Sequence, residues 1–406
     1  MSPSLPPPRA FFTSRPLAFG QQMTQADGVA WMKAALRRVA ETQPVDGLDR
    51  ALRFYDLLAR QSHIDPRVSC LDDYTHQDWD RMRVHTAPHA GDGQDASGFA
   101  GGEPHDWFRA PLDGRMEVFA ETALAVARDA FADDAAAPDA LVQVSCTGYD
   151  SPNAVQHVAV EKGWAAGTRV LSIGHMGCYA AVPAVATAAD VVSAMAGRTG
   201  RDARASVLLV ELCTLHHYPA TTDVEQIVQQ CLFADGAARV DVTAQAPDVR
   251  HFALLDHAEA VLPDTLGEMT WRTASPAFRM TLSRDVPKHI RASVAPFVEA
   301  MLARNGLAVS DVDAFAVHPG GPRVIESTAD ALGLSEASVA HSQAVLRERG
   351  NMSSTTLPHI WSRLLADDAL PAGALVASVA FGPGLTVVGN LLRKGPGRVG
   401  PDLTGK

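Results

Sequence analysis

Apolar segments of strand length alternate with segments of helix length through the first half of this 406-residue chain. Strands are expected at 141–145, 168–174 and 206–213, where aliphatic residues run almost without interruption. The segments between them, 151–163 and 178–197, have the length and apolar spacing of helices. Strands joined by such helices form a parallel sheet, and continuous apolar strands require cover on both faces. The pattern therefore predicts an α/β fold with helices on both sides of the sheet.

The second half of the chain repeats this order of elements. Helices are expected at 294–306, 322–334 and 354–368, and the strand in 313–321 runs into a Gly-Pro turn. Residues 374–393 are typical of a closing pair of strands. No internal repeat is visible in the residues themselves, so a structural duplication is inferred from the order of elements alone.

Helices are also expected before the first apolar strand. The segment 24–41 has apolar residues at helical spacing, with Thr24 as its N-cap, and 49–61 and 115–134 are amphipathic. The stretch 87–105 is rich in Gly, Asp and Ala, which predicts a surface loop.

The N-terminal residues 1–20 contain prolines where a secretory signal needs an unbroken apolar core, so we expect an N-terminal arm. No apolar run is long enough to span a bilayer, and no membrane association is expected. The formal net charge of −11 argues against nucleic acid as a partner, because phosphate binding needs a basic face.

The chain has five cysteines, none in a C-x-x-C pair, so neither a metal site nor a disulfide framework is indicated. An odd number of scattered thiols is typical of a reducing cytoplasm. These features together predict a cytoplasmic enzyme without a metal.

A single cysteine, Cys178, follows a Gly-x-x-Gly turn formed by Gly174 and Gly177. The ordinary interpretation of a lone cysteine is a small buried hydrophobe. Here the turn lies between an apolar strand and an alanine-rich helix, so the sulfur is expected at the helix N-terminus. Unpaired N–H groups and the helix dipole favour an anion there and lower the pKa of a thiol. The turn therefore predicts a nucleophilic thiolate.

Two further residues complete a chemical pattern. Alone, His318 in AVHPGG fits a buried core histidine, and Asn351 in RERGNMSS fits a turn or helix cap. An enzyme that condenses thioesters needs a thiolate to accept an acyl group. It also needs hydrogen-bond donors for the enolate that forms when a malonyl unit loses CO₂. Cys178, His318 and Asn351 together supply these groups.

At this point the sequence resembles a known family, the type III polyketide synthases (chalcone synthase-like, bacterial) of the thiolase superfamily. The resemblance rests on the segments GHMGCYAA, QCLFADGAARV, AVHPGGPRVIE, RERGNMSS and VAFGPGLTV, in this order. It implies the thiolase fold, a duplicated five-layer αβαβα arrangement, as a homodimer. One thiolase-like half, 21–245, would carry the nucleophilic cysteine, and the other, 246–406, the histidine and asparagine.

The resemblance also implies a reaction. Cys178 would carry the starter and the growing chain, while His318 and Asn351 would stabilise charge during decarboxylative Claisen condensation with malonyl-CoA. Phe233 matches the gatekeeping phenylalanine between the CoA tunnel and the cavity. The segment that would shape the cavity near the thiol consists of Gly382, Pro383 and Gly384.

Several positions depart from the plant members of the family. Met280 stands at the second gatekeeper position, and Ser151 replaces a methionine that crosses the dimer interface in plant enzymes. Further cavity positions implied by the resemblance are Cys146, Thr147, Cys213 and Leu215. A more apolar cavity favours an aliphatic or β-ketoacyl starter and a pyrone or resorcinol product. Core packing explains the same residues equally well.

The CoA entrance is less basic than in plant members. Only Arg67 remains of their Lys/Arg cluster, and acidic residues such as Asp72 and Asp73 surround it. Fewer cations weaken the capture of a polyanion. Either Arg323 compensates in binding CoA, or the starter arrives on an acyl carrier protein. We expect malonyl-CoA as the extender.

Two other functions are compatible with parts of this pattern. One is a single-condensation enzyme, similar to ketoacyl synthase III, that uses CoA- or carrier-protein-bound acyl chains. The other is a silent thiolase-fold scaffold that pairs with an active paralogue. The presence of Cys178, His318 and Asn351 argues against the scaffold.

Overall fold

The computed structural model describes residues 5–41, 44–61, 64–85 and 112–398. The loop expected at 87–105 lies outside these residues. Among the described residues, no helix combines the length and the apolar character that crossing a bilayer requires.

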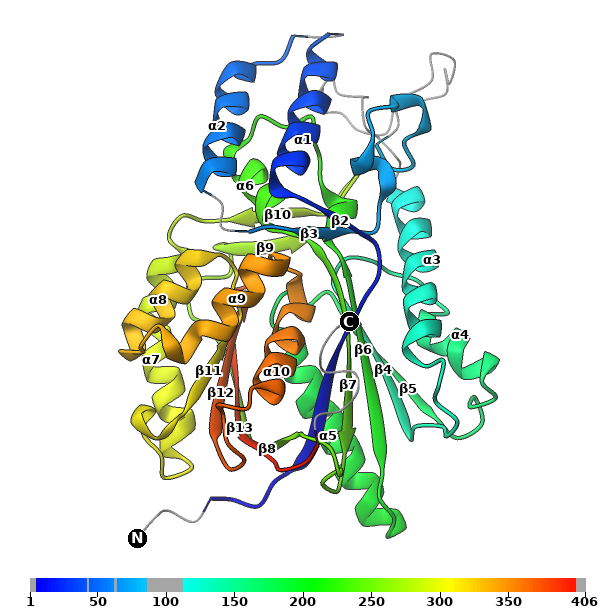
Figure 1. The fold of residues 1–406 in the computed structure, drawn as a ribbon, viewed down its shortest axis with the longest axis vertical. Helices are drawn as coiled ribbons and strands as arrows, with labels where there is room; N and C mark the ends of the chain where they lie inside the picture. Colours follow the sequence, from blue (N-terminus) through cyan, green and yellow to red (C-terminus); the bar gives the residue numbers. More distant parts are fainter. Residues whose placement is uncertain (1–4, 42–43, 62–63, 86–111, 399–406) are drawn as a thin grey trace.

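A nine-stranded mixed sheet forms the centre of the molecule, in the order β11-β12-β13-β8-β1-β7-β6-β4-β5 (Figure 1). Its strands are β1 Ala10–Leu17, β4 Ala140–Ser145, β5 Arg169–Gly174, β6 Arg204–Leu212, β7 Asp235–Thr243, β8 Phe252–Val261, β11 Ala314–Val317, β12 Leu375–Gly382 and β13 Thr386–Lys394. The three strands expected to be parallel, β4, β5 and β6, are parallel. The sheet as a whole is not, because β7, β1, β8 and β13 run antiparallel to their neighbours.

Two short antiparallel pairs lie outside this sheet. They are β2 Gln21–Met23 with β3 Arg67–Ser69, and β9 Met269–Arg272 with β10 Arg279–Leu282. Both pairs lie with α6 beyond one end of the large sheet (Figure 1).

The described residues form ten α-helices, which include each helix expected from the sequence. Their bounds are α1 Gln25–Ala40, α2 Leu48–Gln61, α3 Leu112–Ala130, α4 Ala154–Glu161, α5 Ala181–Thr199, α6 Val224–Leu232, α7 Val286–Ala303, α8 Pro322–Leu332, α9 Ala340–Arg349 and α10 Thr356–Ala366. Thr24 caps α1 as predicted, since its side chain accepts a hydrogen bond from the Asp27 amide at 3.0 Å.

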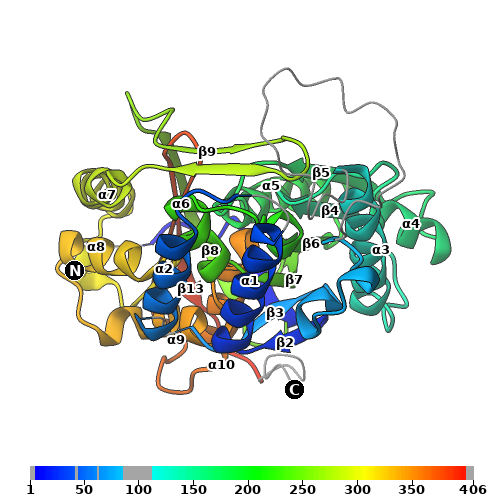
Figure 2. The same ribbon diagram turned by 90° about the horizontal axis from the view of Figure 1, so that it is seen from above.

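Three hydrophobic clusters define the layers of the fold. The middle cluster joins α5 and α10 to both halves of the sheet, through residues such as Val142 on β4 and Val376 on β12. A second cluster packs α3 and α4 against β4 and β6, and a third packs α7 and α8 against β8, β12 and β13. From above, α7 and α8 lie at one end and α3 and α4 at the other (Figure 2). The fold is thus mixed α/β, with helices packed on both faces of the sheet and with α5 and α10 in contact with both of its halves.

The N-terminal segment is not an arm, contrary to the expectation from its prolines. Residues 10–17 form β1, the strand between β7 and β8 that joins the two halves of the sheet. Phe12 lies opposite Val242 on one side and Phe252 on the other. Its ring is 1% exposed and lies 5.2 Å from the Trp361 ring of α10. The burial of alternate side chains explains the difference, because apolar packing outweighs one proline in the strand.

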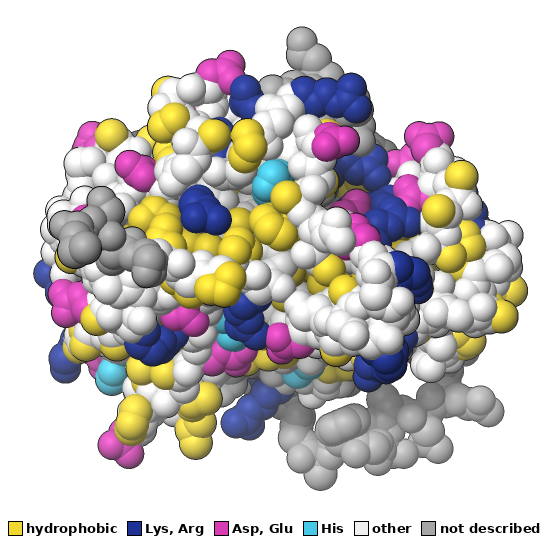
Figure 3. All heavy atoms as spheres, turned by 90° about the horizontal axis from the view of Figure 1, so that it is seen from below, with side chains coloured by type: hydrophobic (Ala, Val, Ile, Leu, Met, Phe, Trp, Pro, Cys, Tyr) yellow, Lys and Arg dark blue, Asp and Glu magenta, His cyan; other side chains and the backbone are white. Residues whose placement is uncertain are grey.

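Charged side chains of both signs are interspersed on the face seen from below (Figure 3). No continuous basic area appears among the described residues of that face. This distribution agrees with the net charge of −11.

Candidate active site

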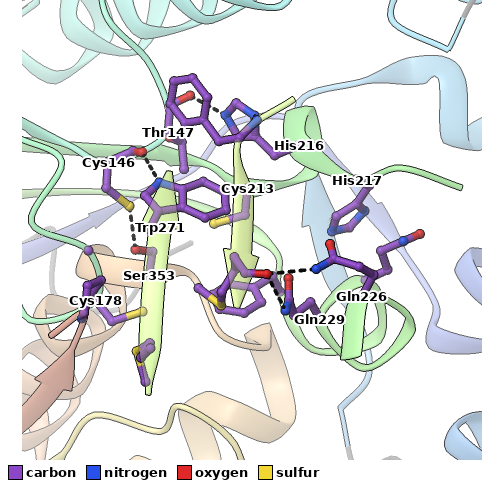
Figure 4. Close-up of a pocket in the computed structure, with 17 residues that line it drawn as sticks. Cys146, Thr147, Cys178, Cys213, His216, His217, Gln226, Gln229, Trp271 and Ser353 are labelled. Carbon is purple, nitrogen blue, oxygen red and sulfur yellow. Dashed lines mark hydrogen bonds between the residues drawn. The ribbon is translucent and has the colours of Figure 1, made fainter. Parts of the chain in front are cut away.

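The carboxyl ends of three parallel strands meet at one cavity. Cys146 and Thr147 follow β4, Cys178 follows β5, and Cys213 follows β6. The cavity holds about 580 Å³ of space free of atoms, including its open mouth. Ligand sites in α/β proteins commonly lie at the carboxyl ends of parallel strands. Figure 4 shows these side chains around the cavity.

A strained turn presents Cys178. Gly177 has a φ of +85°, and a Cβ at this position would lie 2.7 Å from Cδ of Pro383. Glycine is therefore required both by the left-handed backbone and by the close approach of the proline. The turn ends just before α5 starts at Ala181, so Cys178 lies at the N-terminal end of that helix.

The pKa of the Cys178 thiol is shifted opposite to the sequence prediction. Burial raises it to about 12, and the buried carboxylate of Glu211 adds to the rise. Hydrogen bonds to the side chains of Ser353 and Asn351 oppose the shift. The sulfur lies in a cavity whose walls exclude water. Desolvation of the thiolate therefore raises the pKa by more than the N-terminal end of α5 lowers it. The resting group is the neutral thiol.

Asn351 is held next to the predicted gatekeeper. Its backbone amide donates to the Leu232 carbonyl at 3.0 Å, and its carbonyl accepts from the Ala234 amide at 2.9 Å. Phe233 lies between these two partners and forms a bridge with Asn351. The Asn351 side-chain oxygen accepts from the Ser353 amide at 2.9 Å, which orients the side-chain NH₂ group.

His318 follows β11 and is 1% exposed. Burial lowers its pKa to about 3, so the ring is neutral and carries one N–H donor and one acceptor. Neither ring nitrogen has a hydrogen-bond partner in the part of the chain that the structure describes. The Gly320 amide donates to the His318 carbonyl, and the Gly320 carbonyl accepts from the Asn351 side chain at 3.5 Å. A buried, unpaired imidazole on the segment that also bonds Asn351 is suited to a ligand, although neither His318 nor Asn351 is among the residues that line the cavity.

A buried carboxylate that sequence reasoning missed supports the cavity wall. Glu211 accepts hydrogen bonds from the Cys146 amide at 2.9 Å and the Thr147 hydroxyl at 3.1 Å. The Ser354 hydroxyl donates to its other oxygen. Burial raises the pKa of Glu211, and these donors oppose the rise. The carboxylate thereby joins the end of β4 to the segment that follows Asn351.

An aromatic wall, also missed, lines the cavity. The rings of His216 and Phe278 stack at 4.3 Å, and Trp271 lies edge-on to both. His216 Nε2 donates to the Thr147 carbonyl at 2.7 Å, and its Nδ1 accepts from the Phe278 amide at 3.1 Å. Trp271 Nε1 donates to the Cys146 carbonyl at 2.6 Å (Figure 4). These bonds fix the wall in place.

Comparisons with known proteins bear on this arrangement. Residues 254–396 match the C-terminal domain of the chalcone and stilbene synthases. Over its full length the chain is similar to the crystal structure of PKS-I from the brown alga Ectocarpus siliculosus. The TM-score is 0.75 at 26% identity, with 97% of this chain and 99% of that chain covered. The chain belongs to the chalcone and stilbene synthase family.

Two curated relatives in this type III polyketide synthase family give the range of named activities. The "alpha-pyrone synthesis polyketide synthase-like Pks18" of Mycobacterium tuberculosis is 32% identical over 261 residues. That match covers 62% of this chain, and the chain spans 64% of the relative's length. The "1,3,6,8-tetrahydroxynaphthalene synthase" of Streptomyces griseus is 29% identical over 269 residues, covering 65% of this chain and 70% of that protein.

Most cavity positions implied by the family resemblance lie on the cavity wall. They are Cys146, Thr147, Cys213, Phe233, Met280 and Pro383. Leu215 does not, because it is fully buried in the core that contains α3 and α4. Gly382 and Gly384 lie outside the wall on either side of Pro383, and a Cβ at Gly382 would overlap the Tyr179 ring.

Of the residues expected at the CoA entrance and the dimer interface, one is buried and two are exposed. Arg67 is 1% exposed, and its guanidinium donates to the backbone carbonyls of Gln230 at 2.6 Å and Phe233 at 2.9 Å. It is therefore a buried support for the gatekeeper segment and does not face a surface entrance. Arg323 is exposed at the start of α8, and Ser151 is exposed beyond β4.

The described residues contain no group of three or more His, Cys, Asp and Glu side chains placed to hold a metal ion.

Proposed function

We propose that this protein is a polyketide synthase that extends an acyl thioester starter with malonyl-CoA through an acyl group on Cys178. The observation that carries the proposal is the buried thiol with Asn351 as hydrogen-bond partner, together with the buried, unpaired ring of His318, two residues before the Gly320 carbonyl that accepts from Asn351. A thiol, an amide NH₂ and a neutral imidazole are the groups that acyl transfer and enolate stabilisation require.

The reaction would proceed in two stages. In loading, the Cys178 sulfur bonds to the starter carbonyl carbon, and CoA departs as a thiol with the proton that the cysteine gave up. In extension, malonyl-CoA loses CO₂, and the electrons of the broken bond form an enolate whose oxygen His318 and Asn351 hold. The enolate carbon attacks the acyl group, a C–C bond forms, the bond to sulfur breaks, and the Cys178 thiolate returns.

The cavity lining supports an aliphatic or β-ketoacyl starter and a pyrone or resorcinol-type product. Met269, Met280, Phe233 and Cys213 present apolar surface beyond the thiol. Pks18, one of the relatives, is named for α-pyrone synthesis. We propose CoA as the carrier of the extender, with the exposed Arg323 at the N-terminal end of α8 as a contact for its phosphates.

Covalent loading tests the proposal. Wild type incubated with a panel of acyl-CoA and acyl-carrier-protein thioesters should gain one acyl mass, and Cys178→Ala should gain none. Cys231→Ala is a matched control, because Cys231 is also buried with a raised pKa but does not line the cavity. A wild type that no member of the panel acylates would refute the function.

Adding malonyl-CoA then separates a polyketide synthase from a single-condensation enzyme. The mass of the released product counts the malonyl units. Products with two or more units are expected, whereas one unit from every starter would favour the ketoacyl synthase III-like alternative.

We further propose that the protein is a homodimer joined along β5. This strand is the edge of the large sheet, and every one of its side chains is at least partly exposed. Tyr149, 48% exposed, lies over Gly174 at the end of β5, and Ser151 is exposed nearby. An exposed apolar edge strand is commonly covered by a partner.

A further inference from the structure

One polar group on the cavity wall has no role in the chemistry above. His217 follows the short turn Cys213–His216, lines the cavity and is 4% exposed. Its Nε2 has no hydrogen-bond partner in the described residues. In Figure 4 His217 lies beside Gln226, on the side of the cavity away from Cys178.

The contacts of Tyr74 determine which nitrogen of His217 carries the proton. The Tyr74 hydroxyl lies 3.2 Å from the Thr214 carbonyl, 3.2 Å from His217 Nδ1 and 3.0 Å from His85 Nε2. A carbonyl only accepts, so the single hydroxyl proton goes to Thr214, and both histidines donate to the hydroxyl oxygen. His217 therefore has its proton on Nδ1, and Nε2 is an acceptor.

The packing around Tyr74 makes its hydrogen bond with His217 rigid. The Tyr74 ring is buried and lies edge-on to Trp31 at 4.7 Å and to His85 at 5.3 Å. Burial lowers the pKa of His217 well below its usual range, as do the nearby cations Arg67 and Arg115. The ring stays neutral, and its Nε2 lone pair remains available.

Neighbouring donors do not satisfy this lone pair. The side-chain amide of Gln226 donates to the Met280 carbonyl at 2.8 Å, and that of Gln230 donates to the Tyr218 carbonyl at 3.0 Å. The partner must therefore be an O–H or N–H group of a molecule in the cavity. A saturated acyl chain has no such group, and a ketone only accepts. A β-diketone in its enol form carries a hydroxyl.

We infer that His217 binds the growing chain by accepting a hydrogen bond from the enol hydroxyl of a β-diketone unit at the end of the cavity away from Cys178. This inference rests on the proposed function, since extension by malonyl units is what builds a β-diketone on the chain. It makes His217 a determinant of chain length, because a chain must be extended before it reaches the acceptor.

Two variants separate this role from structural support. In His217→Asn the amide nitrogen takes the place of Nδ1 and keeps the bond to Tyr74, but no acceptor remains at the Nε2 position. In His217→Gln the amide oxygen can take the place of Nε2. The measurements are the acyl mass on Cys178, the product distribution with malonyl-CoA, and the thermal unfolding midpoint.

His217→Asn should still be acylated at Cys178, because His217 lies on the other side of the cavity. The ratio of the longest product to shorter products should fall by about fivefold to tenfold, the effect of one lost hydrogen bond. His217→Gln should restore part of that ratio. A His217→Asn enzyme that loads normally and keeps the wild-type distribution would overturn the inference, as would a shift that Gln does not reverse. A wild type that loads or extends no chain would instead refute the proposed function.

Discussion

Unusual backbone torsion angles gather around the Cys178 thiol. His175 and Gly177, with φ of +58° and +85°, precede it, and Ser353, with +51°, follows Asn351. Non-glycine residues adopt such angles at a cost, and they concentrate where a site must hold one geometry. The strain here lies on two sides of the cavity, in the turn before Cys178 and in the segment after Asn351.

The turn at Gly177 gives a direct test. Gly177→Ala should lower the rate of Cys178 acylation by about tenfold or more, because its Cβ would displace Pro383 and move the cavity wall. Gly200→Ala is the matched control, since it has a φ of +70° but no atom within 4 Å of the added Cβ. Both variants should lose about 1–2 kcal/mol of stability. Equal acylation rates in the two variants would contradict a role of the Gly177 turn in positioning Cys178.

Some residues of the site could be predicted from the sequence, and others could not. Cys178, Asn351 and Phe233 occur in distinctive motifs, and the structure brings these segments together. Glu211 was missed because in SVLLVELC it resembles one polar residue in a strand. The raised pKa of the Cys178 thiol was also missed, because burial depends on walls contributed by distant segments.

Among the elements, a charge cluster joins α3 to β6 and β7. Asp134 follows α3 and accepts hydrogen bonds from Arg239 at 2.8 and 2.9 Å and from Arg204 at 2.9 Å. Arg239 is 3% exposed, so its charge depends on such partners. Burial alone would raise the pKa of Asp134, but the two arginines lower it.

Removing this carboxylate should destabilise the fold in a pH-dependent way. At pH 7, Asp134→Asn should lower the free energy of unfolding by about 1–3 kcal/mol. Because the folded pKa lies below the unfolded value, the stabilisation is complete above about pH 4 and is lost as pH falls through the folded pKa. Urea unfolding at pH 7 and pH 3 should show the difference between variant and wild type shrinking. Asp190→Asn, which breaks an exposed pair with Arg9, should change stability by less than about 0.5 kcal/mol.

Periodicity identified most helices, though not α6 or α9, and the strands β4, β5, β6, β11, β12 and β13, because each carries its own apolar pattern. It failed for β1, where the prolines of residues 1–20 suggested an arm and the strand's partners, β7 and β8, lie far along the sequence. The antiparallel strands β7 and β8 were missed for the same reason. The apolar pattern of a segment shows that the segment forms a strand. Which strands lie beside it, and in which direction it runs, depend on the whole sheet.

For the whole molecule, the proposed β5 interface predicts an association state. Wild type should sediment as a dimer, and Tyr149→Asp should raise the dissociation constant by about thirtyfold, as expected for a central aromatic residue. Val160→Asp, a change at an equally apolar exposed residue on α4, should sediment as wild type does. A monomeric wild type would refute the dimer. A Tyr149→Asp variant that dimerises normally would place the interface elsewhere.

The position of β1 also has a consequence for synthesis on the ribosome. Phe11 and Phe12 lie opposite Thr243 and Val242, about 230 residues further along the chain. At roughly 5–20 residues per second, β1 waits on the order of ten to fifty seconds before β7 and then β8 emerge. Until then the two sheet halves have no strand to join them, and the apolar face of β1 is uncovered. β1 is therefore synthesised long before the strands it pairs with, and its apolar face needs protection on the nascent chain during that interval.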